Sequence, residues 1–281
     1  PGLPIDGSTI ITSRDALALQ EVPKRVVIVG AGATGVEFGY VWNTYGSEVT
    51  LVELMPRIIP NEDEESSRLL ERSFLKKGIK SITSSKVVDV KISEPETTVT
   101  ISNDSATNEI KCDKILVAIG TQGNIKNIGI EELGIKTEKD FISVNDQMET
   151  NVPGIYAVGD VTGKMLLAHV ASAQAVVAVE QIAGLDPQPI DYNIVPRAIY
   201  CKPQIASFGL TEKQAIEQGY EVRIGKFPIA ANGKALGMNE AEGMVKLVLE
   251  AEIGDILGAH MVGPEVTELL GELSMARMLE S

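Results

Sequence analysis

Cysteine, histidine and positive charge are all scarce in this sequence of 281 residues. Cys112 and Cys201 are the only cysteines, too few for a disulfide framework or a cysteine-ligated metal site, and typical of a reducing compartment such as the cytoplasm. Lys and Arg number 25 against 39 Asp and Glu, a formal net charge of −14, which disfavours nucleic acids and anionic membranes as partners. No run of about 18 apolar residues occurs, so no membrane span is expected.

A metal site is also disfavoured, because the sequence has few histidines and cysteines, the residues that commonly bind zinc. His169 and His260 are the only histidines, and neither has a partner at metal-ligand spacing. His260 lies in the apolar stretch ILGAHMV, where a place in a core or on a sheet face is expected. Cys112 and Cys201 are far apart and form no CxxC or CxxxxC pair, so each is interpreted as a small packing residue. We expect no metal site.

The apolar pattern predicts an α/β fold. Residues 24–29 (KRVVIV), 49–53 (VTLVE) and 115–119 (ILVAI) are short apolar runs typical of buried parallel strands. Helical patterns separate them, and one is expected to begin with Asn61 as its cap, followed by a solvent-exposed acidic run over 62–65. Alternating β-like segments fill residues 79–110. The order of these elements indicates a doubly wound unit.

Three regions are expected along the chain. Residues 1–119 form the doubly wound domain with a lead-in, 120–191 hold a strand ending at Asp160 and a helix of small residues, and 192–281 show an α+β pattern. The chain begins without Met and stops at Ser281, at the end of a predicted helix whose apolar pattern covers 265–279. We therefore expect a piece of a longer protein.

The glycine pattern Gly30-x-Gly32-x-x-Gly35 carries the strongest functional signal. It follows a predicted strand and opens a predicted helix, and Glu53 ends the next strand about 20 residues on, as a dinucleotide-binding site requires. The glycines permit a tight turn and close backbone approach to a pyrophosphate at the helix start. Glu53 can accept hydrogen bonds from a ribose diol and would repel a 2′-phosphate, which favours NAD over NADP. The alternative is a tight strand–helix turn without a ligand.

Two further acids are ambiguous from the sequence alone. Glu37 follows Gly35 closely, and its simplest interpretation is an acid that pairs with the helix dipole in the first turn. Asp160 lies in Gly159-Asp160-Val-Thr-Gly163-Lys164, which has the wrong glycine spacing for a phosphate-binding P-loop. A strand that runs into Gly-Asp suits a carboxylate that holds a sugar hydroxyl, but an ordinary strand-end turn explains it equally well.

Three blocks of sequence together resemble the pyridine nucleotide–disulfide oxidoreductases. Residues 1–39 are similar to the family's entry into its NAD domain, IYAVGDVTGKMLLAHVASAQA (155–175) to its second FAD segment, and both YCKPQIASFGLTEKQA (200–215) and GKFPIAANGKALGMNEAEGMVKLVLE (225–250) to its dimerisation domain. The resemblance implies a doubly wound NAD-binding domain, a partial FAD-binding segment and a truncated α+β dimerisation domain. The cofactors that it implies are FAD and NAD.

The resemblance also implies roles for individual residues. Around NAD, Gly30, Gly32 and Gly35 would hold the pyrophosphate, Glu53 the adenosine ribose, Val87 would lie near the adenine and Gly120 beside the nicotinamide end. Around FAD, Glu37 would lie near the flavin and nicotinamide rings, Asp160 would bind the ribityl and pyrophosphate region, and Met165, Ala168 and His169 would lie along the isoalloxazine ring.

Parts of the family's machinery are missing from these 281 residues. The first FAD glycine motif, the redox-active CxxxxC and the catalytic His of a His-Pro-Thr-type motif do not occur, so no catalytic residue is expected in this chain. The usual Gly-Arg-x-Pro-Asn after the NAD domain is replaced by the segment 120–124 (GTQGN), so we expect the loop there to differ from that of the family.

The resemblance is closest to those members that oxidise dihydrolipoamide, passing electrons through an enzyme disulfide and FAD to NAD⁺. It implies a cytoplasmic homodimer whose partner is the lipoyl domain of a 2-oxo acid dehydrogenase or glycine cleavage complex, whereas the isolated chain is expected to be inactive. A sister flavin disulfide reductase, of the mercuric reductase or soluble transhydrogenase type, is one alternative. A non-enzymatic NAD-binding module is the other.

Overall fold

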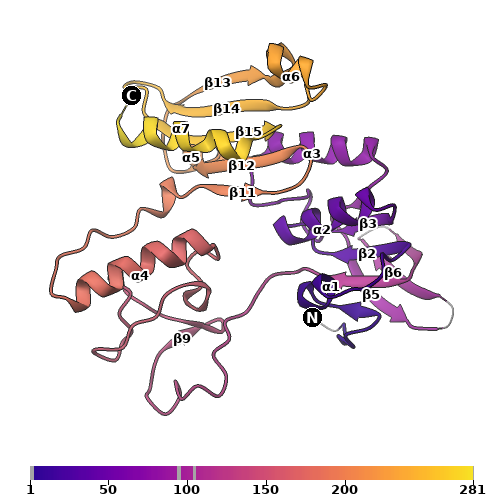
Figure 1. Ribbon diagram of the computed structural model, residues 1–281, viewed down its shortest axis with the longest axis horizontal. Helices are drawn as coiled ribbons and strands as arrows, with labels where there is room; N and C mark the ends of the chain where they lie inside the picture. The colour runs from indigo at the N-terminus through magenta and orange to yellow at the C-terminus, as the bar shows by residue number, and fades with distance from the viewer. Residues whose placement is uncertain (1–2, 94–95, 104–105, 281) are drawn as a thin grey trace. The chain divides into compact units, whose positions relative to one another are not determined.

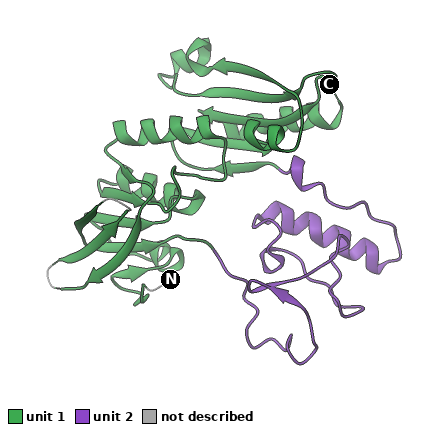
Figure 2. Cartoon of the chain, turned by 180° about the vertical axis from the view of Figure 1, so that it is seen from behind, with its two compact units in different colours: residues 1–120, 196–281 green, residues 121–195 purple. Residues whose placement is uncertain are grey.

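The computed structural model describes residues 3–93, 96–103 and 106–280, so Pro1, Gly2 and Ser281 at the chain ends lie outside the described residues. The chain forms two compact units (Figure 2). Unit 1 combines the residues up to Gly120 with those from Pro196 onward, and unit 2 holds residues 121–195. No helix in the described ranges is both long and apolar enough to cross a bilayer.

The first half of unit 1 is built on a parallel sheet with the strand order β1-β8-β2-β3-β4. Figure 1 labels its strands β2 and β3. Its elements are β1 (Ile10–Ile11), α1 (Ser13–Leu17), β2 (Arg25–Val29), α2 (Ala33–Thr44), β3 (Glu48–Val52), α3 (Glu64–Lys76), β4 (Lys80–Ile82) and β8 (Lys114–Val117). Successive side chains of a strand point to opposite faces. Val26 and Ile28 therefore join the core with Trp42 and Phe74 of α2 and α3, whereas Val27 joins a second core on the other face.

A three-stranded antiparallel meander supplies that second core. It consists of β5 (Lys86–Lys91), β6 (Thr97–Ser102) and β7 (Thr107–Cys112), paired in the order β5-β6-β7. β6 alternates buried and half-buried residues, and Val99 and Ile101 pack with Val27 and Val52 of the parallel sheet. Helices therefore cover one face of the parallel sheet and the meander lies against the other, which confirms the α/β class expected from the sequence.

The second half of unit 1 is an antiparallel sheet with the order β11-β12-β15-β14-β13. Its elements are β11 (Arg197–Ile199), β12 (Gln204–Gly209), α5 (Glu212–Glu217), β13 (Val222–Pro228), η3 (Ile229–Ala231), α6 (Gly233–Gly237), β14 (Met244–Glu250), β15 (Ile256–Gly263) and α7 (Val266–Met278). α7 packs on β12 and β15 through Val266 and Leu270. Ile199, Ile205 and Val262 also belong to the core that contains Trp42 and Phe74, so one apolar core joins the two halves of unit 1.

Unit 2 contains little regular structure. Its elements are β9 (Thr137–Glu138), β10 (Phe141–Ile142), η1 (Asp160–Thr162), α4 (Ala168–Ile182) and η2 (Tyr192–Ile194). The prediction of a strand that runs into Gly159 is wrong. Among the described residues, this segment forms only an isolated bridge between Glu149 and Tyr156. A strand needs a neighbour for its backbone hydrogen bonds, and the described residues of unit 2 offer none along this segment.

The acidic segment before α3 also differs from expectation. The helix cap is Asp63, whose carboxylate accepts from the Glu65 amide at 3.0 Å, and not Asn61. Glu62 and Asp63 are 7% and 3% exposed, so this part of the acidic run is not solvated. Glu62 pairs with Arg197 and Asp63 with Lys246, both of the antiparallel sheet. Sequence reasoning missed these ion pairs because the partners are far apart in the sequence.

Candidate nucleotide-binding site

The glycine turn after β2 is held by contacts too close for any side chain. Gly30 has φ +100°, and a Cβ on it would lie 2.3 Å from the Ala118 carbonyl oxygen at the end of β8. A Cβ on Gly35 would lie 2.0 Å from the Gly30 carbonyl oxygen. Both positions therefore require glycine. At Gly30 the turn passes directly against the backbone that follows β8, and at Gly35 the helix α2 lies directly against the end of its own entry strand.

The start of α2 offers unpaired amides to an anion. Gly32 is the N-cap, and no side chain caps the helix. The first amides of a helix have no acceptor within it and carry partial positive charge. A Cβ built on Gly32 would meet no heavy atom within 4 Å, so open space lies beside this cap. An uncapped helix start next to open space fits a pyrophosphate.

Glu53 lies at the end of β3, next to the turn, and is 8% exposed. One carboxylate oxygen accepts from the Ala31 amide at 2.7 Å and the other from the Met55 amide at 2.9 Å. The side chain therefore anchors the glycine turn, a function that the spacing alone did not reveal. Each carboxylate oxygen can accept more than one hydrogen bond, so both retain capacity for a sugar hydroxyl.

Gly120 and Val87 complete the set of residues predicted around the dinucleotide. Gly120 is exposed and follows β8, the sheet neighbour of β2. The turns after β2, β3 and β8 share one edge of the parallel sheet, so Gly30, Glu53 and Gly120 lie at the same carboxyl edge, where such folds bind ligands. Val87 is a half-buried residue of β5 that packs with the core containing Val52.

Glu37 does not pair with the helix dipole. It lies in the second turn of α2, and its Oε1 accepts from the Tyr200 amide at 2.8 Å, just after β11. Burial raises the pKa of this carboxyl group, and the hydrogen bond from Tyr200 opposes the shift only in part. A half-buried acid thus links the nucleotide-binding half of unit 1 to the antiparallel sheet, a contact that sequence reasoning missed because the partners are 163 positions apart.

The residues predicted to contact a flavin all belong to unit 2. Asp160 is exposed on η1, and Met165, Ala168 and His169 lie at or just before the start of α4. The turn at Gly159 and Asp160 is held by Gln174 of α4, whose side chain is fully buried. Gln174 Oε1 accepts from the Gly159 amide at 2.7 Å, and its Nε2 donates to the Tyr192 hydroxyl at 3.0 Å. Gln174 was missed because a lone amide in a helix of small residues gives no motif.

The remaining polar candidates are buried. Cys112 and Cys201 are both free thiols, and burial raises their pKa values to about 11 and about 12. His260 is fully buried in β15, where Nε2 lies 3.0 Å from the Leu210 carbonyl oxygen and burial lowers its pKa. No group of His, Cys, Asp and Glu in the described ranges has the arrangement of a metal site.

Comparisons with known proteins agree with this architecture. Residues 1–175 match the family described as pyridine nucleotide-disulphide oxidoreductase, and residues 195–280 match the dimerisation domain of that family. Dihydrolipoyl dehydrogenases of Mycobacterium leprae and Bacillus subtilis are 48% and 44% identical to the chain, which aligns over 96% and 100% of its length. The alignments cover 58% and 60% of those two relatives, so the chain spans about three fifths of their length.

Solved structures give the same result. The crystal structure of LpdA from Mycobacterium tuberculosis superimposes with a TM-score of 0.90 at 27% identity, covering 99% of this chain and 61% of that one. The HOCl-induced flavoprotein disulfide reductase RclA from Escherichia coli gives a TM-score of 0.89 at 26% identity, covering 99% of this chain and 64% of that one.

Proposed function

The chain belongs to the pyridine nucleotide-disulphide oxidoreductase family, and from this premise we propose that it carries the cofactor-binding parts of a dihydrolipoyl dehydrogenase. The curated relatives at 44–48% identity bear that name. The single observation that carries the proposal is the uncapped start of α2 beside open space, with the buried Glu53 anchoring the adjacent turn. This arrangement fits NAD.

The residues at the carboxyl edge of the parallel sheet hold NAD in this proposal. Amides of the turn that contains Gly30, Gly32 and Gly35 bind the pyrophosphate, and Glu53 accepts from the adenosine ribose. The carboxylate of Glu53 would be brought close to a 2′-phosphate in NADP, and this repulsion selects NAD. Val87 lies toward the adenine and Gly120 toward the nicotinamide, as the family resemblance implies.

Unit 2 contributes part of a FAD site. Asp160 accepts from the ribityl and pyrophosphate region, and the α4 start with Met165, Ala168 and His169 lies along the flavin ring. As at the start of α2, the first amides of α4 have no side-chain cap, because its N-cap residue is Leu167. These amides can therefore donate to the flavin. Gln174 holds the turn that carries Asp160. Glu37, on α2, contributes an acid near the flavin and nicotinamide rings.

FAD supplies the step that carries electrons from an enzyme dithiol to NAD⁺. The chain supplies no catalytic residue for this reaction. A redox thiol must ionise readily to react, whereas burial raises the pKa values of Cys112 and Cys201 to about 11 and about 12. The roles left to this chain are to bind, orient and exclude water around the two cofactors.

Partners follow from the same proposal. The antiparallel sheet, which matches the family's dimerisation domain, pairs with a second copy in a homodimer. A lipoyl domain of a 2-oxo acid dehydrogenase or glycine cleavage complex brings the substrate, and the cytoplasm is the proposed compartment.

Titration calorimetry with NAD⁺ and with NADP⁺ tests the proposed site. We expect NAD⁺ to bind more tightly than NADP⁺, and we expect no NADH formation when dihydrolipoamide, FAD and NAD⁺ are supplied to the chain. Tighter binding of NADP⁺ would contradict the role of Glu53. Turnover above background would show that a reaction centre exists in this chain after all.

A sister flavin disulfide reductase is a second candidate, and the similarity to RclA favours it. The curated relatives at 44–48% identity favour the first candidate. Activity of the whole protein distinguishes them, because only a dihydrolipoyl dehydrogenase reduces NAD⁺ at the expense of dihydrolipoamide.

A further inference from the structure

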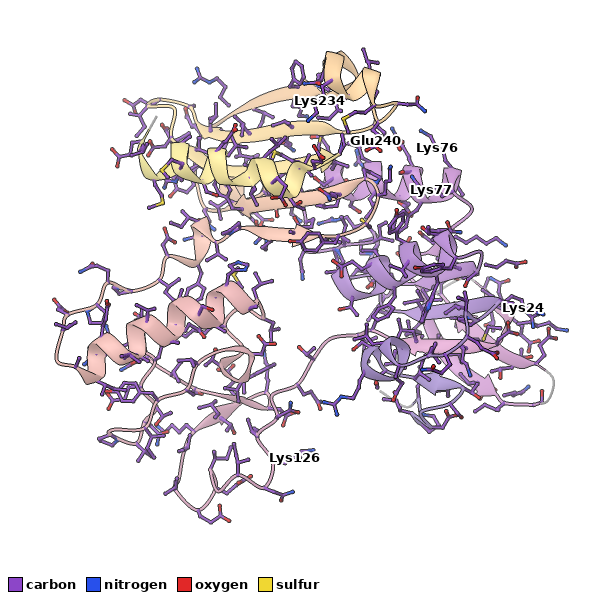
Figure 3. All side chains as sticks on the ribbon, viewed as in Figure 1. Lys24, Lys76, Lys77, Lys126, Lys234 and Glu240 are labelled. Atoms are coloured by element: carbon purple, nitrogen blue, oxygen red, sulfur yellow. The ribbon has the colours of Figure 1, made fainter. Side chains whose placement is uncertain are left out.

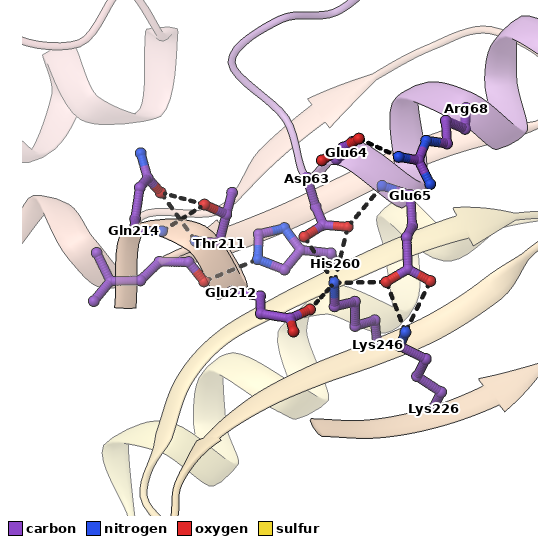
Figure 4. A network of polar contacts seen from close by, with 11 residues as sticks. Asp63, Glu64, Glu65, Arg68, Thr211, Glu212, Gln214, Lys226, Lys246 and His260 are labelled. Atoms are coloured by element: carbon purple, nitrogen blue, oxygen red, sulfur yellow. Dashed lines mark hydrogen bonds and ion pairs between the residues drawn. The ribbon is translucent and has the colours of Figure 1, made fainter. Parts of the chain in front are cut away.

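Lys246 of β14 is a charged side chain inside the protein. Its side chain is 2% exposed, and its Nζ lies 3.0 Å from Asp63, 2.8 Å from Glu65 and 2.8 Å from Glu212 (Figure 4). Other lysines, such as Lys24, point away from the ribbon (Figure 3). Burial opposes the charge of Lys246, but its hydrogen bonds to the carboxylates outweigh burial and raise its pKa.

Two of these carboxylates belong to the nucleotide-binding half of unit 1. Asp63 is the N-cap of α3, and Glu65 lies in the first turn of that helix. The preceding Glu62 is held by the same antiparallel sheet, since the Ser207 hydroxyl donates to it at 2.6 Å and Arg197 Nε lies 3.6 Å away. The antiparallel sheet therefore contacts the start of α3 through several of its strands.

From the start of α3 the contacts continue to the glycine turn. The Glu62 amide donates to the Ile59 carbonyl oxygen at 3.0 Å, and the Ser67 hydroxyl to the Ile58 carbonyl oxygen at 2.7 Å. The Ile59 amide donates to the Ala31 carbonyl oxygen at 2.7 Å. Ile59 has φ +39°, which is strained for a β-branched residue and persists only where the surroundings impose it.

We propose that Lys246 is a positioning residue for the dinucleotide. By fixing Asp63 at the start of α3, it fixes the segment 58–62, whose Ile59 amide holds the Ala31 carbonyl between Gly30 and Gly32. The pyrophosphate-binding amides are thereby kept in place by a side chain of the dimerisation domain. This inference rests on the proposed NAD site and adds a residue that does not touch the nucleotide.

Lys226 provides a matched control. It lies directly opposite Lys246 in the β13–β14 pairing and binds Glu65 at 2.7 Å, but its side chain is 44% exposed and its ion pair does not include the helix cap. Loss of one positive charge beside Glu65 occurs in both lysine variants, whereas loss of the ion pair with the α3 cap occurs only in the Lys246 variant. A positioning role predicts an effect at the glycine turn from Lys246 alone.

The test measures amide hydrogen exchange of residues 28–36 and the Kd for NAD⁺ in the whole chain. We expect Lys246→Met to accelerate exchange in this segment and to raise the Kd, each by about tenfold, whereas Lys226→Met changes each by less than about twofold. Asp63→Asn retains a capping side chain but weakens the tie to Lys246, so an effect of about threefold is expected.

Equal exchange at the turn in the two lysine variants would overturn the proposal, as would an unchanged turn in Asp63→Asn. If Lys246→Met does not fold, Asp63→Asn decides alone: faster exchange at 28–36 supports the proposal and unchanged exchange refutes it. Absence of NAD⁺ binding by the unmodified chain would instead refute the proposed function. The exchange measurement would still decide whether Lys246 holds the turn.

Discussion

The two units support their predicted cofactor residues by different means. In unit 1 the residues around the glycine turn follow strands that pair with one another, so backbone ladders fix Gly30, Glu53 and Gly120 at one sheet edge. In unit 2 the turn with Asp160 follows a segment that forms no ladder among the described residues. There the Gly159 amide donates to the buried Gln174, and the Gly159 carbonyl oxygen accepts from the Thr162 hydroxyl at 2.8 Å. Backbone ladders fix three positions of the unit 1 site together, whereas the turn in unit 2 depends on a few side-chain and turn contacts.

The largest effect is expected from Gly35→Ala, which changes the glycine turn of unit 1 itself. The new methyl group would lie 2.0 Å from the Gly30 carbonyl oxygen, within the backbone of the turn. We expect a loss of about 3 kcal/mol or more in the free energy of unfolding and no measurable NAD⁺ binding. Chemical denaturation and calorimetry check the two parts.

Gly32→Ala is the control for this substitution, because its methyl group would meet no atom within 4 Å. Its stability should change by less than about 1 kcal/mol, while the methyl group fills the space proposed for the pyrophosphate and weakens binding. Normal NAD⁺ affinity in Gly32→Ala would mean that the nucleotide lies elsewhere.

A smaller effect is expected from Glu53→Ala. This substitution separates the two functions of Glu53, which are to hold the glycine turn and to select NAD over NADP. Loss of the hydrogen bond to the Ala31 amide should weaken the binding of NAD⁺ and of NADP⁺ alike. A change in the ratio of the two affinities therefore reports only the repulsion between the Glu53 carboxylate and the 2′-phosphate. We expect the preference for NAD⁺ over NADP⁺ to fall by about tenfold, measured by parallel titrations. Glu53→Gln keeps an amide acceptor without the charge and should lower the ratio similarly. An unchanged ratio in both variants would assign selection to another residue.

The sequence was most informative where the chemistry is local. The glycine turn, the position of Glu53 after the second strand and the helix of small residues all depend on residues close together in the chain, and the pattern predicted them. That helix was expected over 168–183 and is α4 (Ala168–Ile182) in the structure. The burial of Asp63 and the hydrogen bond from Tyr200 to Glu37 depend on partners 183 and 163 positions away. Sequence periodicity carries no information over such separations, so only the structure could reveal these contacts.

The half-buried Glu37 predicts a pH dependence of stability. Because burial raises its pKa above the ordinary 4.5, the folded state binds this proton more tightly than the unfolded state does. Its contribution to stability is therefore complete below pH 4.5 and is lost as the pH rises through the folded pKa. We expect Glu37→Gln to melt at a higher temperature than the unmodified chain at pH 7, with the difference vanishing at lower pH.

Melting curves of both chains between pH 4 and pH 8 test this expectation. Glu48→Gln, at an exposed position of β3, is the control and should show no such pH-dependent difference. A lower melting temperature for Glu37→Gln at pH 7 would mean that the ionised carboxylate strengthens its bond to the Tyr200 amide by more than burial costs.

The smallest effect is expected from Asp160→Ala. The side chain is exposed in unit 2, and the residues proposed to hold NAD all belong to unit 1. NAD⁺ affinity should stay within about twofold of the unmodified value, as measured by calorimetry. In the whole protein the same change should reduce the flavin retained through purification. A large loss of NAD⁺ affinity would show that the two units do not act independently.

The apolar core shared by the two halves of unit 1 has a thermodynamic consequence. Trp42 and Phe74 of the nucleotide-binding half pack in one cluster with Ile205 and Val262 of the antiparallel sheet, so the two halves should unfold together. A ligand bound only by the folded state then stabilises both, by about 2.7 kcal/mol at a concentration of about one hundred times its Kd. We therefore expect a dinucleotide bound at the glycine turn to protect the antiparallel sheet as well from unfolding and proteolysis.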